Sequence, residues 1–185
     1  VIVIGNEVLS AKVNDANGPQ ILHLFADLGI KVVEMAVLAD DIERIAVVVR
    51  DYAARFELVV TTGGVGPTHD DCTWRAVAQA FGVPLVFHPD LAERLAKHLG
   101  APLTAEQQRL AWLPQGAELV PVAGRWPLFR MQQVYVLPGV PALVAKNLKQ
   151  IETLVRERGV AAHSLATAYF TVDEWHALAE IDRVV

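Results

Sequence analysis

The residue types with the clearest chemical use lie together in residues 61–73, which read TTGGVGPTHDDCT. Glycines let the backbone approach a phosphate closely, and free N–H groups at the start of a helix favour an anion. The segment holds no Lys, so it is not a Walker loop, and its spacing does not match the G-x-G-x-x-G dinucleotide fingerprint. A glycine-rich turn closed by a capping Asp is the simpler interpretation, but three glycines exceed what a cap requires. We therefore predict a phosphate site with these ligand-binding residues: Thr62, Gly63, Gly64, Gly66 and Thr68.

Two adjacent carboxylates, Asp70 and Asp71, follow this loop. Carboxylates repel phosphate unless a cation lies between them, and Mg²⁺ is typically held by one or two carboxylates plus phosphate oxygens. Asp40 ends a predicted strand at the same edge of the sheet, so it is a candidate further ligand. All three aspartates are also ordinary helix caps. We predict a divalent metal at Asp40, Asp70 and Asp71, and a catalytic group made of Asp70, Asp71 and His69, with His69 donating to a phosphate oxygen or acting as an acid.

Further candidates lie at other strand ends and helix starts. Glu7, after the first strand, has no evident structural need, whereas capping alone explains Asn17. Arg125 lies in a predicted loop at residues 124–128 (GRWPL), where it can pair with phosphate while Trp126 stacks on a ring. The proline and glycine residues of LPGVP also fit turn chemistry alone. These positions complete the predicted ligand-binding set: Gly5, Glu7, Asn17, Arg125, Pro138, Gly139 and Pro141.

The elements that position these residues alternate between short β-branched runs and amphipathic stretches of helical length. Residues 1–4 are continuously apolar, as expected of a strand buried on both faces. The predicted strands are 1–4, 31–38, 57–62, 118–122, 132–137 and 166–172; the predicted helices are 17–28, 42–54, 70–81, 88–99, 104–111 and 141–158, with a last one from Asp173. Residues 113–116 are predicted to form a turn. This order predicts an α/β fold with a mostly parallel sheet and helices on both faces.

The composition excludes several classes of protein. The 185 residues include 16 Lys and Arg against 21 Asp and Glu, for a net charge of −5. Without a basic run, the chain lacks the footprint of a nucleic-acid binder. A single Cys excludes an internal disulfide and Cys-based zinc patterns, and without a His–Asp partner Cys72 is expected to be a packing residue. The apolar runs are too short to span a bilayer and no signal peptide is visible. We expect one domain over residues 1–185 in a cytoplasmic protein with no nucleic-acid or membrane partner.

Several motifs act together as a signature. IGNEVLS, Asn17, the Asp40 and Asp41 pair, TTGGVGPTHDDCT and LPGVP, in this order, resemble the molybdopterin-binding (MoaB/Mog) domain family in its CinA-like branch. The resemblance covers nearly the whole chain, and GGVGPTHDD followed by AVAQAFG is its most specific part. GPTHDD, HPDL, RWPL before VYVLPGVP, and TAYFTVDEWHALAEI make the chain most similar, within that branch, to the N-terminal molybdopterin-binding-like domain of eukaryotic FAD synthases.

The resemblance implies a three-layer α/β sandwich on a mixed, mostly parallel sheet, with a site at residues 63–71 closed by LPGVP. In the molybdenum-cofactor proteins of this family the loop holds the phosphate of the pterin, and the position matching Asp71 is important to activity. Asp40 matches a second acidic position there. The CinA-like and FAD-synthase branches imply metal-dependent hydrolysis of dinucleotide pyrophosphates such as ADP-ribose or FAD. Relatives also imply a homodimer or homotrimer.

The chain departs from the CinA pattern at three places. Residues 124–128 replace a common GTAPG, which favours an FAD-synthase-like ligand over ADP-ribose. Asn6 and Leu143 stand where Asp and Glu are common, so neither position supplies a carboxylate to a metal. The leading hypothesis is a metal-dependent pyrophosphatase acting on FAD or a related nucleotide. The alternatives are a module that binds molybdopterin or a nucleotide without hydrolysis, and a family member retained as an oligomeric partner.

Overall fold

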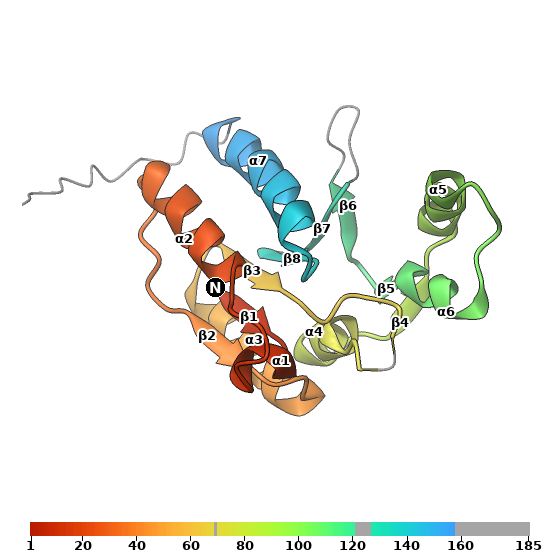
Figure 1. Ribbon diagram of the computed structural model, residues 1–185, viewed down its shortest axis with the longest axis horizontal. Coiled ribbons are helices and arrows are strands. Elements are labelled where there is room, and N and C mark those ends of the chain that lie inside the picture. The colour runs from red at the N-terminus through yellow and green to blue at the C-terminus, as the bar shows by residue number, and fades with distance from the viewer. Residues whose placement is uncertain (69, 121–126, 158–185) are drawn as a thin grey trace, which may run out of the picture.

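A six-stranded mixed sheet forms the centre of the protein. The computed structural model describes residues 1–68, 70–120 and 127–157 (Figure 1). In sheet order the strands are β2 (Ala36–Leu38), β1 (Ile2–Ile4), β3 (Val59–Thr62), β8 (Val134–Leu137), β7 (Leu128–Met131) and β6 (Glu118–Val120). The first four are parallel to one another, and β7 and β6 are antiparallel additions at one side. The mostly parallel mixed sheet predicted from the sequence is confirmed.

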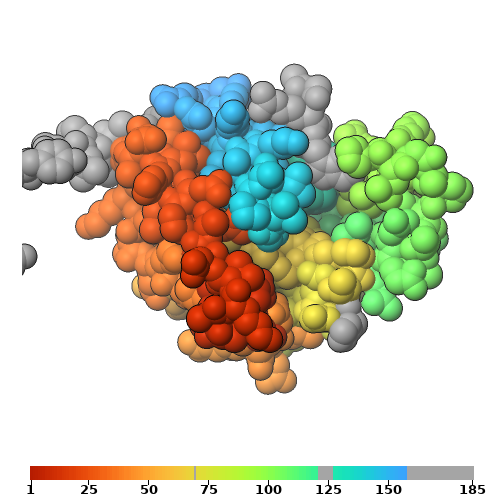
Figure 2. Space-filling view, in the orientation of Figure 1, coloured from red at the N-terminus to blue at the C-terminus, as the bar shows by residue number. Residues whose placement is uncertain are grey.

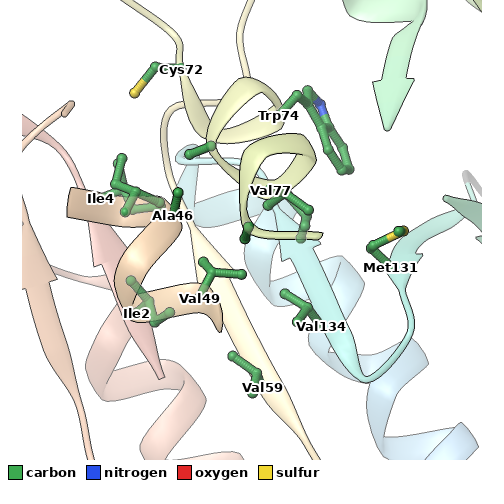
Figure 3. Packing of buried hydrophobic residues seen from close by; sticks show 14 of the residues in the cluster. Ile2, Ile4, Ala46, Val49, Val59, Cys72, Trp74, Val77, Met131 and Val134 are labelled. Atoms are coloured by element: carbon green, nitrogen blue, oxygen red, sulfur yellow. The ribbon is translucent and has the colours of Figure 1, made fainter. Parts of the chain in front are cut away.

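Helices cover both faces of this sheet and make three layers. Two of them, α2 (Asn17–Asp27) and α7 (Pro141–Glu157), pack together on one face, and α3 (Ile42–Arg55) and α4 (Thr73–Phe81) pack together on the other (Figure 1). Val59 and Val60 are neighbours in β3 but belong to different hydrophobic clusters, because successive strand side chains point to opposite faces. Figure 3 shows the cluster beneath α3 and α4, where strand residues such as Val59 face Val49 and Val77. Burial on both faces explains the continuous apolar runs in these strands.

A separate excursion leaves the sheet after α4. It consists of β4 (Leu85–Phe87), α5 (Pro89–Leu99), α6 (Ala105–Gln108), the 3₁₀ helix η1 (Arg109–Ala111) and β5 (Trp112–Pro114). Strands β4 and β5 pair antiparallel in a second, two-stranded sheet. His88 caps α5 by accepting from the Leu91 N–H at 3.3 Å, and Thr104 forms a reciprocal capping box with Gln107. Both predicted helix starts are therefore confirmed.

Several predicted boundaries are wrong, including the start of β8, which begins at Val134 and not at residue 132. Strand β2 covers only the end of the predicted 31–38, because it lies at the sheet edge and pairs with the three residues of β1 alone. Helix α4 begins at Thr73 and not at residue 70, because the preceding residues form a turn of their own. The predicted turn at 113–116 begins with β5, and β7 starts inside what was predicted as the loop 124–128.

The remaining elements complete this description. The short helix α1 (Asn6–Leu9) follows β1 directly, where no helix was predicted. No helix among the described residues has the length and apolar character needed to cross a membrane. The predicted strand 166–172 and the helix from Asp173 lie outside the described residues, so one domain over 1–185 stays a prediction.

Candidate functional site

The glycine loop after β3 adopts a conformation that requires glycine. Gly63 has φ of +99° and Gly64 has φ of +63°. A Cβ on Gly63 would collide with the carbonyl oxygen of Ile4 in the neighbouring strand. The N–H and Oγ1 of Thr73 donate to the carbonyl oxygens of Gly64 and Gly63, at 3.0 and 2.8 Å, and thereby fix the loop to the start of α4. The tight turn therefore brings the loop backbone against both the sheet and the helix.

The loop also presents unused hydrogen-bond donors. The backbone N–H groups of Gly64, Val65 and Gly66 donate to no acceptor among the described residues. All three residues lie on the wall of a cavity. Backbone N–H groups are strong donors that are almost always paired in folded proteins, with protein, water or ligand. This arrangement suits an anion with several oxygens, such as a phosphate.

Asp71 holds the far end of this loop. Its Oδ2 accepts from the Thr68 N–H at 2.9 Å and from the Thr68 hydroxyl. Gly66 approaches so closely that a Cβ there would lie 2.5 Å from the same Oδ2. The N-cap of α4 is Cys72, without a side-chain cap, so the prediction that Asp70 or Asp71 caps this helix is wrong. Asp71 is half-buried and lines the cavity, whereas Asp70 is exposed.

Asp40 reaches the loop from the end of β2. Its Oδ2 accepts from the Asn6 N–H at 2.8 Å, and the Asn6 side-chain oxygen accepts from the Asp40 N–H at 3.3 Å. The Asp40 Oδ1 lies 3.5 Å from the position that a Cβ on Gly64 would occupy. Its neighbour Asp41 caps α3 by accepting from the Arg44 N–H at 2.8 Å. Of this acidic pair, Asp41 is therefore the cap and Asp40 is the residue beside the loop.

These carboxylates fit a metal that takes part of its shell from a ligand. Asp40 and Asp71 flank the glycine loop, and in each the Oδ1 accepts no hydrogen bond from a described residue. The described residues contain no cluster of three or more His, Cys, Asp or Glu that could hold a metal ion by themselves. Mg²⁺ commonly uses one or two carboxylates, with phosphate oxygens and water completing its octahedron. The donor set fits such an ion bound together with a phosphate, and does not fit an all-protein metal cage.

The pKa of Cys72 reflects its burial and the carboxylates beside the glycine loop. Its side chain is 2% exposed, and burial raises the pKa of its thiol above the ordinary value, with the Asp40 carboxylate as the next largest cause and Asp71 adding to it. A thiol that stays protonated is a poor nucleophile. The prediction that Cys72 is a packing residue is confirmed.

Asn17 connects the two turns at the edge of the site. Its Nδ2 donates to the Thr62 Oγ1 at 3.1 Å and to the Gly139 carbonyl at 2.8 Å. The Thr62 hydroxyl donates in turn to the Pro138 carbonyl at 2.8 Å. The N-cap of α2 is Ala16, and the Asp15 side chain accepts from the N–H groups of Asn17 and Gly18, so the interpretation of Asn17 as a cap is wrong. Asn17 and Thr62 are buried behind the cavity wall, where they position its backbone.

The cavity itself has a volume of about 1010 Å³, and its wall includes the residues that follow the carboxyl ends of the parallel strands β3 and β8. It opens between the start of α7 (cyan), the glycine-loop segment (yellow) and the α5 segment (green) in Figure 2. Open α/β sheets place ligands at this end. The predicted site residues on its wall are Glu7, Gly63, Gly64, Gly66, Asp71, Pro138 and Gly139. Among the other predicted residues, the Thr68 hydroxyl binds Asp71, and Gly5 packs against the Glu7 carboxylate. Pro141 opens α7, at the helix position that tolerates proline.

The rest of the wall is formed by residues outside the predicted ligand-binding set. Trp74 is 9% exposed and packs edge-to-face on Phe129, with ring centroids 5.5 Å apart at 74°. Leu91, Leu95 and His98 of α5 lie on a further side, and α7 contributes Leu143, Lys146, Asn147, Lys149 and Gln150. The apolar and aromatic part of this wall suits a flat ring, because cofactor sites are mostly apolar with few placed polar groups.

Two predicted residues lie outside the described part of the chain. His69, predicted as catalytic, and Arg125, predicted to bind phosphate, both belong to the ranges that the structure does not describe. Their roles stay predictions.

Comparison with known proteins identifies the family. Residues 1–157 match the family described as "probable molybdopterin binding domain", and the chain belongs to this family. It is 37% identical over 151 residues to a CinA-like protein of Anaeromyxobacter dehalogenans, an alignment that covers 76% of this chain and 36% of that protein. A CinA-like protein of Desulfovibrio desulfuricans is 30% identical over 190 residues, covering 98% of this chain and 45% of the relative. The chain therefore spans less than half the length of these relatives. The similarity to FAD synthases stays a prediction.

Solved structures give the same fold. A crystal structure of CinA, a protein with unknown function from Thermoplasma acidophilum, has a TM-score of 0.76 at 29% identity and covers 83% of this chain and 95% of that chain. The tungsten cofactor synthesizing protein MoaB from Pyrococcus furiosus has a TM-score of 0.53 at 21% identity, with 89% and 95% covered. The second likeness shows the fold alone. The predicted CinA-like, MoaB/Mog-type α/β sandwich is confirmed.

Proposed function

We propose that this domain binds a phosphate-bearing nucleotide in the glycine-loop cavity and hydrolyses the pyrophosphate of a dinucleotide such as FAD or ADP-ribose with a divalent metal. One observation carries the proposal: the unused N–H groups of residues 64–66 lie on the wall of a large cavity, with Asp40 beside Gly64 and Asp71, also on the wall, beside Gly66. Donors for phosphate and ligands for a cation therefore meet at one place.

The residues of the chain would divide the work as follows. The loop N–H groups orient one phosphate, and the Oδ1 atoms of Asp40 and Asp71 hold the metal beside it. A bound divalent ion polarises the phosphoryl group and lowers the pKa of a water molecule. Trp74 supplies an apolar contact for the ring of the ligand. Asp71 would have two roles: its Oδ1 binds the metal, and its Oδ2 accepts from Thr68 and so holds the loop in place.

Turnover with a matched variant tests this function. The protein is incubated with FAD or ADP-ribose, with Mg²⁺ or with EDTA, and AMP is measured. We expect AMP only when metal is present. The rate of AMP release should fall by at least about 100-fold in Asp71→Asn, because losing a direct metal ligand should cost at least as much as losing a residue that only supports one, for which about 100-fold is the upper end. Asp41→Asn, which alters an α3 cap away from the cavity, is the control and should keep its rate. Equal AMP release by wild type and Asp71→Asn would contradict the proposal.

A non-hydrolytic binding module is the second candidate, and a specific observation favours it. The described residues form no cluster of three metal ligands, and the Asn6 side chain is engaged with the Asp40 backbone. Such a module would bind molybdopterin or a nucleotide and release it unchanged. Pterin fluorescence that co-purifies with the protein, together with no AMP from either dinucleotide, would favour this candidate over hydrolysis.

A further inference from the structure

Helix α7 presents a buried polar side chain without a partner to the cavity. Asn147 is 7% exposed, lines the cavity, and makes no hydrogen bond to any described residue. The polar atoms of its amide are not fully buried, so they reach the surface of the cavity. An amide that is sheltered from bulk solvent yet faces a cavity is therefore available to a ligand.

Two cations lie on the same wall. Lys146 and Lys149 of α7 line the cavity, and within the described part of the chain neither forms an ion pair. The acidic residues of the wall, Glu7 and Asp71, belong to α1 and to the glycine loop. The cavity therefore carries negative charge on the side of the loop and positive charge on the side of α7.

We propose that Lys146 and Asn147 form a second polar subsite, which binds the half of the ligand remote from the glycine loop. Lys146 pairs with the second phosphate, and Asn147 hydrogen-bonds the sugar or base attached to it. This inference rests on the proposed function and adds to it the residues that would hold the second half of the dinucleotide.

The size and charge of the cavity support this assignment. A volume of about 1010 Å³ lies at the top of the range of about 300–1,000 Å³ for drug-sized ligands, so there is room for more than one ring system. A phosphate at the loop lies beside carboxylates and needs a cation, whereas a phosphate at Lys146 is neutralised directly. Charge-assisted hydrogen bonds of this kind are roughly twice as strong as neutral ones.

Binding measurements on Lys146→Gln test the subsite. Calorimetric titration with Mg²⁺ compares AMP with the methylene analogues of ADP-ribose and FAD, whose phosphate bridge cannot be hydrolysed. We expect Lys146→Gln to bind the better dinucleotide analogue about tenfold more weakly and to bind AMP as the wild type does. Lys12→Gln, which removes an exposed lysine outside the cavity, is the matched control. Asn147→Ala, verified as folded by its melting curve, should show the same selective loss.

The outcomes separate the subsite from the proposed function. The subsite would be overturned if Lys146→Gln weakened the binding of AMP and of the analogues equally, or if it weakened the binding of neither. Wild-type protein that binds none of the three ligands would overturn the proposed function and the subsite with it. Selective loss of analogue binding in a protein that does not hydrolyse FAD or ADP-ribose would support the subsite while rejecting hydrolysis.

Discussion

Asn17 illustrates how a buried side chain positions the backbone of the cavity wall. Its amide donates to both the Thr62 hydroxyl and the Gly139 carbonyl, two groups that are far apart in the sequence. Because β3 and β8 are parallel neighbours, their carboxyl ends meet, and Asn17 joins the two turns that follow them. Asn17 therefore helps to set the relative position of the glycine loop and of the residues after β8, together with the hydrogen bond from the Thr62 hydroxyl to the Pro138 carbonyl.

Replacing Asn17 should destabilise the fold. We expect Asn17→Ala to lower the free energy of unfolding by about 1–3 kcal/mol, because the Thr62 hydroxyl and the Gly139 carbonyl lose a buried donor. Urea denaturation followed by circular dichroism measures the change. Asn14→Ala, at an exposed loop position, should stay within about 0.5 kcal/mol of the wild type. If Asn17→Ala lowers the free energy of unfolding no more than Asn14→Ala does, the hydrogen bonds of Asn17 to Thr62 and Gly139 contribute nothing to stability.

Cys72 gives a prediction about pH. Because burial and the neighbouring carboxylates raise the pKa of its thiol, the reactive thiolate is scarcer at pH 8 than in an unfolded chain. We expect iodoacetamide to label folded protein far more slowly than protein in urea at pH 8. The rate in the folded protein should rise with pH and continue to rise above pH 9. Fast labelling of folded protein at pH 7 would contradict the described position of Cys72.

At the scale of elements, the turn between β3 and α4 controls the site. Gly63→Ala should lower the free energy of unfolding by roughly 3 kcal/mol or more, because it combines a left-handed backbone with a collision against β1. Gly100→Ala is a close control, since Gly100 also has positive φ but has no neighbouring atom within 4 Å of its Cβ position. It should cost only about 1 kcal/mol. Urea denaturation measures both variants. An equal decrease in the free energy of unfolding for Gly63→Ala and Gly100→Ala would show that the close contact of Gly63 with the Ile4 carbonyl is unimportant.

The parallel half of the sheet could be predicted because its signal is strong. Residues 1–4 and 59–62 form apolar or Thr-rich runs that follow from burial on both faces, and each precedes a glycine. The β7–β8 hairpin could not be predicted, because its turn at residues 132–133 lacks the Asn-Gly or Asp-Gly signal. Instead, Gln132 takes a φ of +52°. The three-residue strands β4 and β5 are likewise too short to show a period.

The site could be predicted on one side only. The glycine loop and Asp71 follow from residue types next to a strand end, which is a local pattern. The wall formed by α7 depends on how a helix packs, and helical spacing alone does not separate a polar residue that faces a cavity from one that faces solvent. Asn147 and Gln150 lie three residues apart beside the apolar stripe of α7, and this break in polarity was the available signal.

For the whole molecule, a net charge of −5 does not prevent the binding of small anions. The glycine loop offers backbone N–H groups in place of lysines, and the lysines of α7 add positive charge locally. Under the proposed function, Asp40 and Asp71 would add a bound cation. The negative total still opposes nucleic acid, since that binding depends on broad basic surfaces. The expected homodimer or homotrimer stays a prediction that sedimentation can test.

The most direct test of this account is a crystal structure of the domain with Mg²⁺ and a methylene analogue of FAD or ADP-ribose. The account predicts one phosphate within hydrogen-bond distance of the N–H groups of residues 64–66, the metal on Asp71, and a ring against Trp74. The second phosphate should lie toward Lys146. An analogue bound elsewhere, or bound in the cavity with its phosphates away from the glycine loop, would contradict the account.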